Sequence, residues 1–197
     1  MDKRAESQWK KSDISYQNYQ NYLSKKADRY ELTFIDLLYI SNFKGGNSTI
    51  NEIESEINTK LIQYSVGLRN ISDHFNEKSL EILKEDEVEL LISKVQVIID
   101  LTKKGSENKI DGFSVSYLSA LLNAYFPNLI PILDRRLLFN LELVTKPDKD
   151  SQDQIKNIQK FYKTLIIKMS ELIKEKGETI REVDRRIFSE PLKNNVN

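Results

Sequence analysis

The sequence contains no cysteine and has little glycine, proline or histidine. The missing thiols exclude disulfides, thiolate metal sites, iron–sulfur clusters and cysteine nucleophiles, and their absence is typical of a reducing compartment. His74 is the only histidine, so a metal site with several histidine ligands is also excluded. We therefore expect a cytoplasmic protein with no metal and no cofactor.

Long hydrophobic runs are missing as well. The longest apolar stretches, such as 95–99 with Gln96 inside it, are far too short to span a bilayer. The first residues are charged and are followed by no apolar segment, so they do not form a secretory signal. These observations predict a soluble protein without a membrane partner.

The chain also lacks an excess of charge of either sign. It has 30 Lys and Arg and 30 Asp and Glu, which gives a formal net charge of zero. Proteins that coat nucleic acid non-specifically need many unopposed cations. If DNA is the partner, the contact must therefore be local and specific for shape.

Helical periodicity is what the sequence does contain. The 6 glycines and 4 prolines fall between segments whose apolar residues recur every three or four positions, and no segment alternates as a strand would. This pattern predicts an all-α fold, with a flexible N-terminal tail (1–12), one helical domain of two lobes (13–190) and a C-terminal tail (191–197). The expected helices cover about 13–28, 34–44, 50–71, 78–84, 86–104, 115–126, 134–141, 152–176 and 180–190.

Local signals mark several helix ends. Capping-box spacing, which pairs a hydroxyl with an acid three residues later, occurs at Thr49–Glu52 and Thr179–Glu182, and Thr33 followed by Asp36 is a similar cap. Gly105 and Gly177 follow apolar helical stretches and are expected to end them.

One stretch, 108–141, indicates a function. Asp111-Gly112 predicts a turn in which the glycine takes a positive φ, and Ser114 or Ser116 would cap the next helix. After Pro131, Asp134 stands at the start of a further helix. Such a hairpin, over about 86–141, presents backbone N–H groups that bind a phosphate without a large positive charge. A nearby carboxylate can stabilise a cationic sugar or activate a water molecule.

Gly112, Ala120 and Asp134, in this order, resemble the hallmark of the helix-hairpin-helix superfamily of base-excision DNA glycosylases. Further segments resemble a bacterial group of glycosylase-like proteins: Phe43-Lys44, Ser119–Leu122, Phe126-Pro127, 131–136 and 177–187. The resemblance implies a two-lobed all-α fold with a cleft, a DNA partner and excision of a damaged or modified base. The resemblance assigns catalysis to Asp134, and we expect DNA contacts from Gly112, Phe113, Ser114 and Ser116 of the hairpin and from Lys109, which flanks it.

The sequence departs from the family pattern at two points. Ser114 replaces the second glycine of the hairpin, and no lysine follows the hairpin at the place of the Schiff-base amine of bifunctional glycosylases. A glycosylase with this sequence would therefore be monofunctional, with water as its nucleophile.

The same residues also allow a structural interpretation. Asp134 is suited to be a helix N-cap or to form ion pairs, and Asp-Arg-Arg occurs at 134–136 and again at 184–186. The candidates for such pairs between the central and last helices are Arg135, Arg136, Arg181, Asp184 and Arg185. The protein would then be a non-catalytic interaction module that keeps the glycosylase-like scaffold and binds another protein.

Aromatic residues near the N-terminus allow two interpretations in the same way. Trp9, Tyr16, Tyr19 and Tyr22 follow one another at helical spacing. Such a series forms either part of a core or interface, or a platform on which bases stack.

Overall fold

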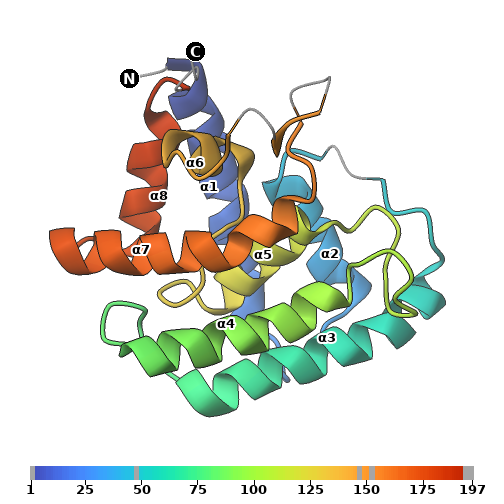
Figure 1. Ribbon diagram of the computed structural model, residues 1–197. Coiled ribbons are helices and arrows are strands. Elements are labelled where there is room, and N and C mark those ends of the chain that lie inside the picture. Colours follow the sequence, from blue (N-terminus) through green and yellow to red (C-terminus); the bar gives the residue numbers. More distant parts are fainter. Residues whose placement is uncertain (1–2, 47–48, 146–147, 151–153, 193–197) are drawn as a thin grey trace.

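The computed structural model describes residues 3–46, 49–145, 148–150 and 154–192 (Figure 1). Over these residues the regular structure is helical, with one isolated β-bridge between Lys149 and Ile155. The predicted all-α class is confirmed. The elements are α1 (Lys3–Leu23), α2 (Phe34–Phe43), α3 (Glu54–Phe75), α4 (Glu85–Asp100), α5 (Val115–Tyr125), α6 (Arg135–Asn140), the 3-10 helix η2 (Ile158–Phe161), α7 (Tyr162–Lys176) and α8 (Ile180–Ser189).

The first helix corrects the predicted N-terminal tail. Helix α1 begins at Lys3 and ends at Leu23, so residues 3–12 are helical and not a tail. Ala5 and Trp9 are buried, and the Trp9 ring packs against Phe188 of α8 with ring centroids 5.6 Å apart. These two buried residues, one turn apart, are too few to give the apolar periodicity from which a helix is predicted.

Other predicted boundaries were wrong: α1 ends at Leu23 and not near 28, and α4 ends at Asp100, so Gly105 does not end it. Helix α3 begins after Ile53, and Glu52 accepts a hydrogen bond from the Asp111 amide (2.6 Å) instead of capping a helix with Thr49. The segment near 78–84 is a turn, held by Leu80 N, which donates to a backbone carbonyl 2.8 Å away. The predicted helix over 152–176 begins only at η2, and residues 151–153 lie outside the described part.

Other predicted ends are confirmed. Capping boxes are present at Thr33–Asp36 and at Thr179–Glu182, whereas Ser114 stands at the N-cap position of α5 without a capping hydrogen bond from its side chain. Gly177 ends α7 with a φ of +64°. At these positions the interactions that define the helix end lie within four residues, so the local sequence was sufficient to find them.

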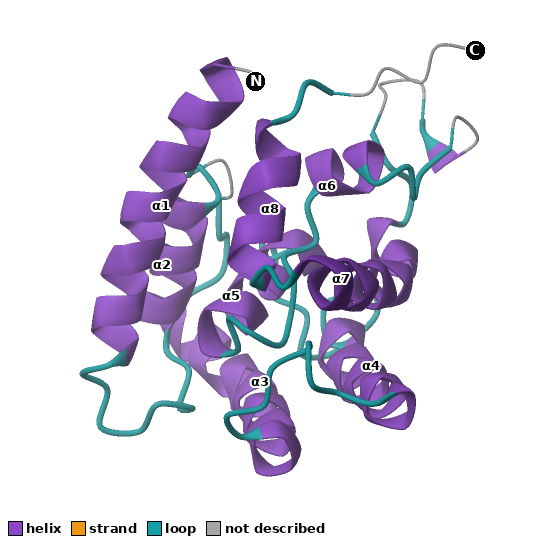
Figure 2. Cartoon of the chain, turned by 90° about the vertical axis from the view of Figure 1, so that its left-hand side faces the viewer, coloured by secondary structure: helices purple, strands orange, loops and turns teal. Residues whose placement is uncertain are grey.

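The helices pack around α5, which lies in the middle of the molecule (Figures 1 and 2). Helix α1 packs against α2 and α8, α3 runs beside α4, and α4 also contacts α7. Helix α5 contacts α1 and α2, and every one of its residues from Leu118 to Tyr125 is buried. The N-terminal and C-terminal helices thus pack together as expected, while a two-lobed, glycosylase-like arrangement stays a prediction. None of the described helices is long and apolar enough to cross a membrane.

Two buried polar side chains of α5 fix the chain that leads to Asp134. The Ser119 hydroxyl accepts a hydrogen bond from the Leu133 amide at 2.9 Å, and the Asn123 amide donates to the Ile130 carbonyl at 2.8 Å. Buried polar groups need such partners because desolvation without them is costly. Since Leu133 precedes Asp134, these bonds position that residue at the start of α6.

Gly112 lies in the predicted turn and has a φ of +86°. A Cβ at this position would lie only 2.1 Å from the backbone oxygen of Thr49. The turn between α4 and α5 is therefore packed against the chain that precedes α3, and both its backbone conformation and this close approach require glycine.

Candidate functional site

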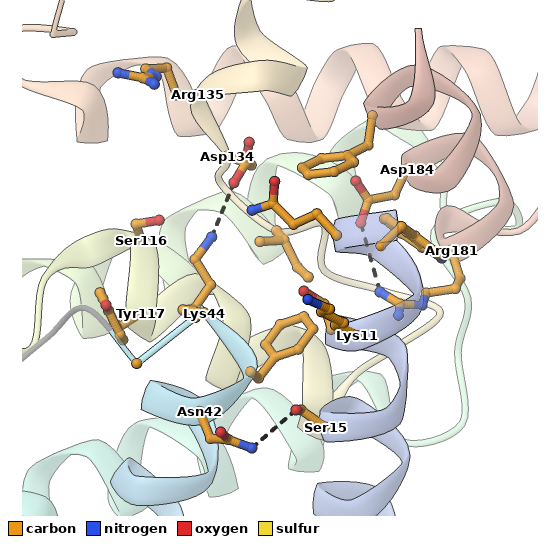
Figure 3. A pocket seen from close by; sticks show the side chains of 18 of the residues that line it. Lys11, Ser15, Asn42, Lys44, Ser116, Tyr117, Asp134, Arg135, Arg181 and Asp184 are labelled. Atoms are coloured by element: carbon orange, nitrogen blue, oxygen red, sulfur yellow. Dashed lines mark hydrogen bonds and ion pairs between the residues drawn. The ribbon is translucent and has the colours of Figure 1, made fainter. Parts of the chain in front are cut away.

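A cavity of about 590 Å³ lies where α1, α8, the end of α2 and the start of α6 meet (Figure 3). We call it the Asp134 cavity. Its charged lining residues are Lys11, Lys44, Asp134, Arg135, Arg181 and Asp184. Its aromatic lining residues are Trp9, Phe43, Tyr117 and Phe188.

Asp134 is held by two interactions. It is the N-cap of α6, where one carboxylate oxygen accepts a hydrogen bond from the Arg136 amide at 2.8 Å. The other oxygen accepts one from Lys44 Nζ at 3.1 Å, and 26% of the side chain remains exposed. Burial alone would raise the pKa of Asp134, but the Lys44 ammonium and the Arg136 amide outweigh it and hold that pKa below its usual value. The carboxylate is therefore ionised at neutral pH.

Lys44 follows the last residue of α2 and is separated from Asp134 by 90 residues in the sequence. Its side chain is mostly buried and reaches across the cavity to Asp134 (Figure 3). The Phe43-Lys44 pair was recognised only as part of the family resemblance, and Lys44 was not predicted to belong to the site. Gly45 and Gly46, both at positive φ, turn the chain directly after it.

Asp184 enters the same cavity from α8, and its side chain is only 8% exposed. Its nearest cation is Arg181 Nη1 at 4.0 Å, while Nη2 of the same guanidinium donates to Asp13 at 2.7 Å. The guanidinium also lies over the rings of Trp9 (4.2 Å) and Tyr16 (4.5 Å). Burial raises the pKa of Asp184 to about 7; Arg181 opposes this rise and Asp134 adds to it.

Most of the predicted hairpin residues lie outside this cavity. Ser116 lines it, and the Ser116 hydroxyl donates to the Leu133 carbonyl at 3.1 Å. Lys109, Gly112, Phe113 and Ser114 line a second hollow of about 420 Å³, together with Lys103 and Lys104. The two hollows are neighbours, because Ile158 lines both. Phe113 is buried, and Lys109 is paired with Asp111 at 2.7 Å.

The predicted arginines do not pair with Asp134, whose ion-pair partner is Lys44. Arg135 is exposed and donates to the Gln154 side chain at 2.9 Å. Arg136 donates to the Glu190 carbonyl at 2.6 Å, which ties α6 to the end of α8, and Arg185 is exposed. The connection between these two helices therefore uses backbone acceptors and not a lattice of Asp–Arg pairs.

The aromatic residues near the N-terminus do not all have the same surroundings: some belong to the core and others lie at the cavity. Trp9 lines the cavity and Tyr16 packs on Arg181 beside it. Tyr19 belongs to the core, where its hydroxyl donates to the buried Asp36 carboxylate at 2.9 Å. Trp9 is thus the member of the series that a cavity ligand can reach.

Basic side chains outnumber acidic ones around the cavity, although the whole chain is neutral. Lys11, Lys44, Arg135 and Arg181 line it against Asp134 and Asp184. In the described part of the chain, the acidic and histidine residues form no group that could hold a metal ion. The lining is therefore suited to an anionic ligand that also carries a flat ring.

In comparisons with known proteins, no family model, no curated protein and no solved structure matches this chain.

Proposed function

We propose that the protein binds DNA and hydrolyses the N-glycosidic bond of a nucleotide that is flipped into the Asp134 cavity. The observation that carries this proposal is the Asp134 carboxylate, which Lys44 and the Arg136 amide hold at the lining of a cavity of about 590 Å³. Pockets that enclose small organic ligands have volumes of about 300–1,000 Å³. Flipped bases are read by stacking between aromatic side chains, and Trp9, Phe43 and Phe188 supply rings in this lining.

Asp134 would act where positive charge develops. When the glycosidic bond breaks, the sugar becomes a cation, which a fixed carboxylate stabilises. The same carboxylate accepts a proton from the attacking water. Its position is well defined, because the N-cap bond to Arg136 and the bonds from α5 to the preceding chain hold it at the start of α6.

Lys44 would exchange partners when DNA binds. In the free protein its ammonium neutralises Asp134 at 3.1 Å. A phosphate next to the flipped nucleotide competes for that ammonium on its flexible four-carbon stem. Transfer of Lys44 to the phosphate leaves the Asp134 carboxylate free to face the sugar.

The neighbouring hollow would hold another phosphate of the same strand. It contains the N-terminus of α5 and the basic residues Lys103, Lys104 and Lys109. A helix N-terminus and local cations together bind phosphate without a high net charge. This arrangement agrees with a chain whose formal net charge is zero.

The proposal is tested with duplexes that carry a stable abasic analogue. A pyrrolidine nucleotide has a positive charge where the sugar cation develops, whereas a tetrahydrofuran nucleotide has the same shape and no charge. We expect the wild type to bind the pyrrolidine duplex roughly tenfold or more tightly, because transition-state mimics bind better than neutral ligands. Asp134→Asn should lose this preference, and Asp73→Asn, on the exposed face of α3, should keep it.

Two results would contradict the proposal. One is an absence of binding to any duplex at low salt, where even weak phosphate contacts are detectable. The other is equal affinity of the wild type for the two analogues.

A non-catalytic interaction module remains the second candidate. It is favoured by the double structural use of Asp134, which caps α6 and pairs with Lys44 at once. On this view Asp134→Asn lowers the unfolding free energy through loss of the Lys44 ion pair, since asparagine can still cap α6, and the protein shows no preference for the charged abasic analogue.

A further inference from the structure

Asp184 is the one acidic group in the Asp134 cavity that the proposed mechanism does not use. We propose that Asp184 is the general acid that protonates the departing base, whereas Asp134 is the general base that accepts a proton from water. This inference rests on the proposed function and assigns the second carboxyl group of the same site.

The position of Asp184 suits a proton donor. It belongs to α8 and its carboxyl group is directed into the cavity beside Arg181 (Figure 3). Its side chain is 8% exposed, and no described protein group donates a hydrogen bond to its carboxyl group. The Arg181 nitrogen at 4.0 Å is beyond hydrogen-bond distance, since N–H···O bonds span about 2.7–3.2 Å.

The charged groups around Asp184 do not compensate for its burial. Arg181 forms its short hydrogen bond with Asp13 of α1, and its guanidinium lies over the rings of Trp9 and Tyr16, so Asp184 receives only the longer contact. Lys44 is paired with Asp134, and the Asp134 carboxylate itself repels a second negative charge. A buried carboxyl group with no donor close to it is more stable in its neutral form, which carries an O–H donor.

The two carboxyl groups of the cavity therefore differ in protonation. Burial raises the pKa of Asp184 to about 7, whereas Lys44 and the Arg136 amide lower that of Asp134. Two neighbouring carboxyl groups with pKa values moved apart in this way can serve as acid and base in one reaction.

The reaction can then be written with each proton placed. As the bond between the sugar C1′ and the base nitrogen breaks, its electron pair moves to the base, and a ring nitrogen of the base takes the proton of Asp184. The oxygen of a water molecule bonds to C1′, and Asp134 takes a proton from that water. The products are the free base and an abasic sugar, and solvent then removes the proton from Asp134 and returns one to Asp184.

This assignment makes the effect of Asp184 depend on the leaving base. A neutral purine needs a proton to leave, whereas a purine methylated on its ring nitrogen already carries a positive charge. General acid catalysis contributes about 10²–10⁴-fold to rate. We therefore expect Asp184→Asn to lower the release of neutral bases by roughly a hundredfold or more and that of cationic bases by only a few-fold.

The experiment uses the full chain and two DNA substrates. DNA treated with a methylating agent contains cationic N-methylpurines, and DNA treated with nitrous acid contains neutral deaminated purines. Released bases are identified by mass spectrometry over pH 5.5–8.5. With the wild type, release of neutral bases should fall as the pH rises past about 7, because the acid must be protonated, and this fall should be absent for the cationic bases.

Control variants separate the possible results. Asp134→Asn should release neither kind of base, and Asp73→Asn should match the wild type. Circular dichroism checks that each variant is folded. If Asp184→Asn lowers the release of both kinds of base equally, or of neither, the general-acid role is wrong while base excision stands. If the wild type releases no base from either DNA, the proposed function fails and this inference fails with it.

Discussion

Replacement of the buried Asp184 by asparagine should change how stability depends on pH. The folded protein raises the pKa of this carboxyl group from 3.8 to about 7, so it binds the proton more tightly than the unfolded chain does. The stabilising contribution of the neutral acid is complete below the unfolded pKa and is lost as the pH rises through about 7. Asparagine is similar in shape and cannot ionise, so Asp184→Asn removes this loss.

The size of the effect follows from the shift. One pKa unit corresponds to about 1.4 kcal/mol, so a change from 3.8 to about 7 has an upper limit of about 4 kcal/mol. Relaxation of water and side chains around the charge reduces this value. We expect the unfolding free energy of Asp184→Asn, relative to wild type, to rise by roughly 2–4 kcal/mol between pH 4.5 and pH 8.

The assay is urea unfolding of both proteins at several pH values, followed by circular dichroism. The difference between variant and wild type cancels the titration of all groups that the two proteins share. Asp73→Asn, on the exposed face of α3, serves as the control and should show no such trend. A difference that stays constant from pH 4.5 to pH 8 would show that Asp184 is ionised throughout and that the argument from its burial is wrong.

Other substitutions test the framework of the site. Gly112→Ala should lower the unfolding free energy by roughly 1–3 kcal/mol in urea unfolding, because it places a Cβ against the Thr49 carbonyl at positive φ. Thr179→Ala removes the hydroxyl that caps α8 and should cost about 1 kcal/mol in the same measurement. Asp13→Asn weakens the short ion pair of Arg181 and should lower the pKa of Asp184, read from the carboxyl carbon by NMR titration.

Local sequence was sufficient for much of the fold. The boxes at Thr33 and Thr179 and the stop at Gly177 were found because each depends on neighbours within one helical turn. The start of α1 was missed because contacts with α8 stabilise it. The polar sequence around Trp9 gives little indication of these contacts. The capping box predicted at Thr49 does not form for a similar reason. The Glu52 carboxylate accepts a hydrogen bond from the Asp111 amide, 59 residues away, instead.

The site was predicted less completely than the fold. Asp134 was identified because its place at a helix start is a local property. Its ion-pair partner, Lys44, lies 90 residues away and was not predicted, since only the tertiary fold brings the end of α2 and the start of α6 to the same cavity. The roles of Asp184 and Arg181 depend in turn on how α8 lies against α1.

The contrast between the two carboxyl groups has one physical origin. Asp134 stands at the N-cap of α6, where backbone N–H groups have no partner within the helix, so an amide is available to its carboxylate. Asp184 lies within α8, where the amides are already bonded to carbonyls one turn earlier, so donors must come from side chains. The nearest such donor, Arg181, is held by Asp13 and by the rings of Trp9 and Tyr16. One carboxyl group is therefore stabilised as an anion and the other as a neutral acid, although both face the same cavity.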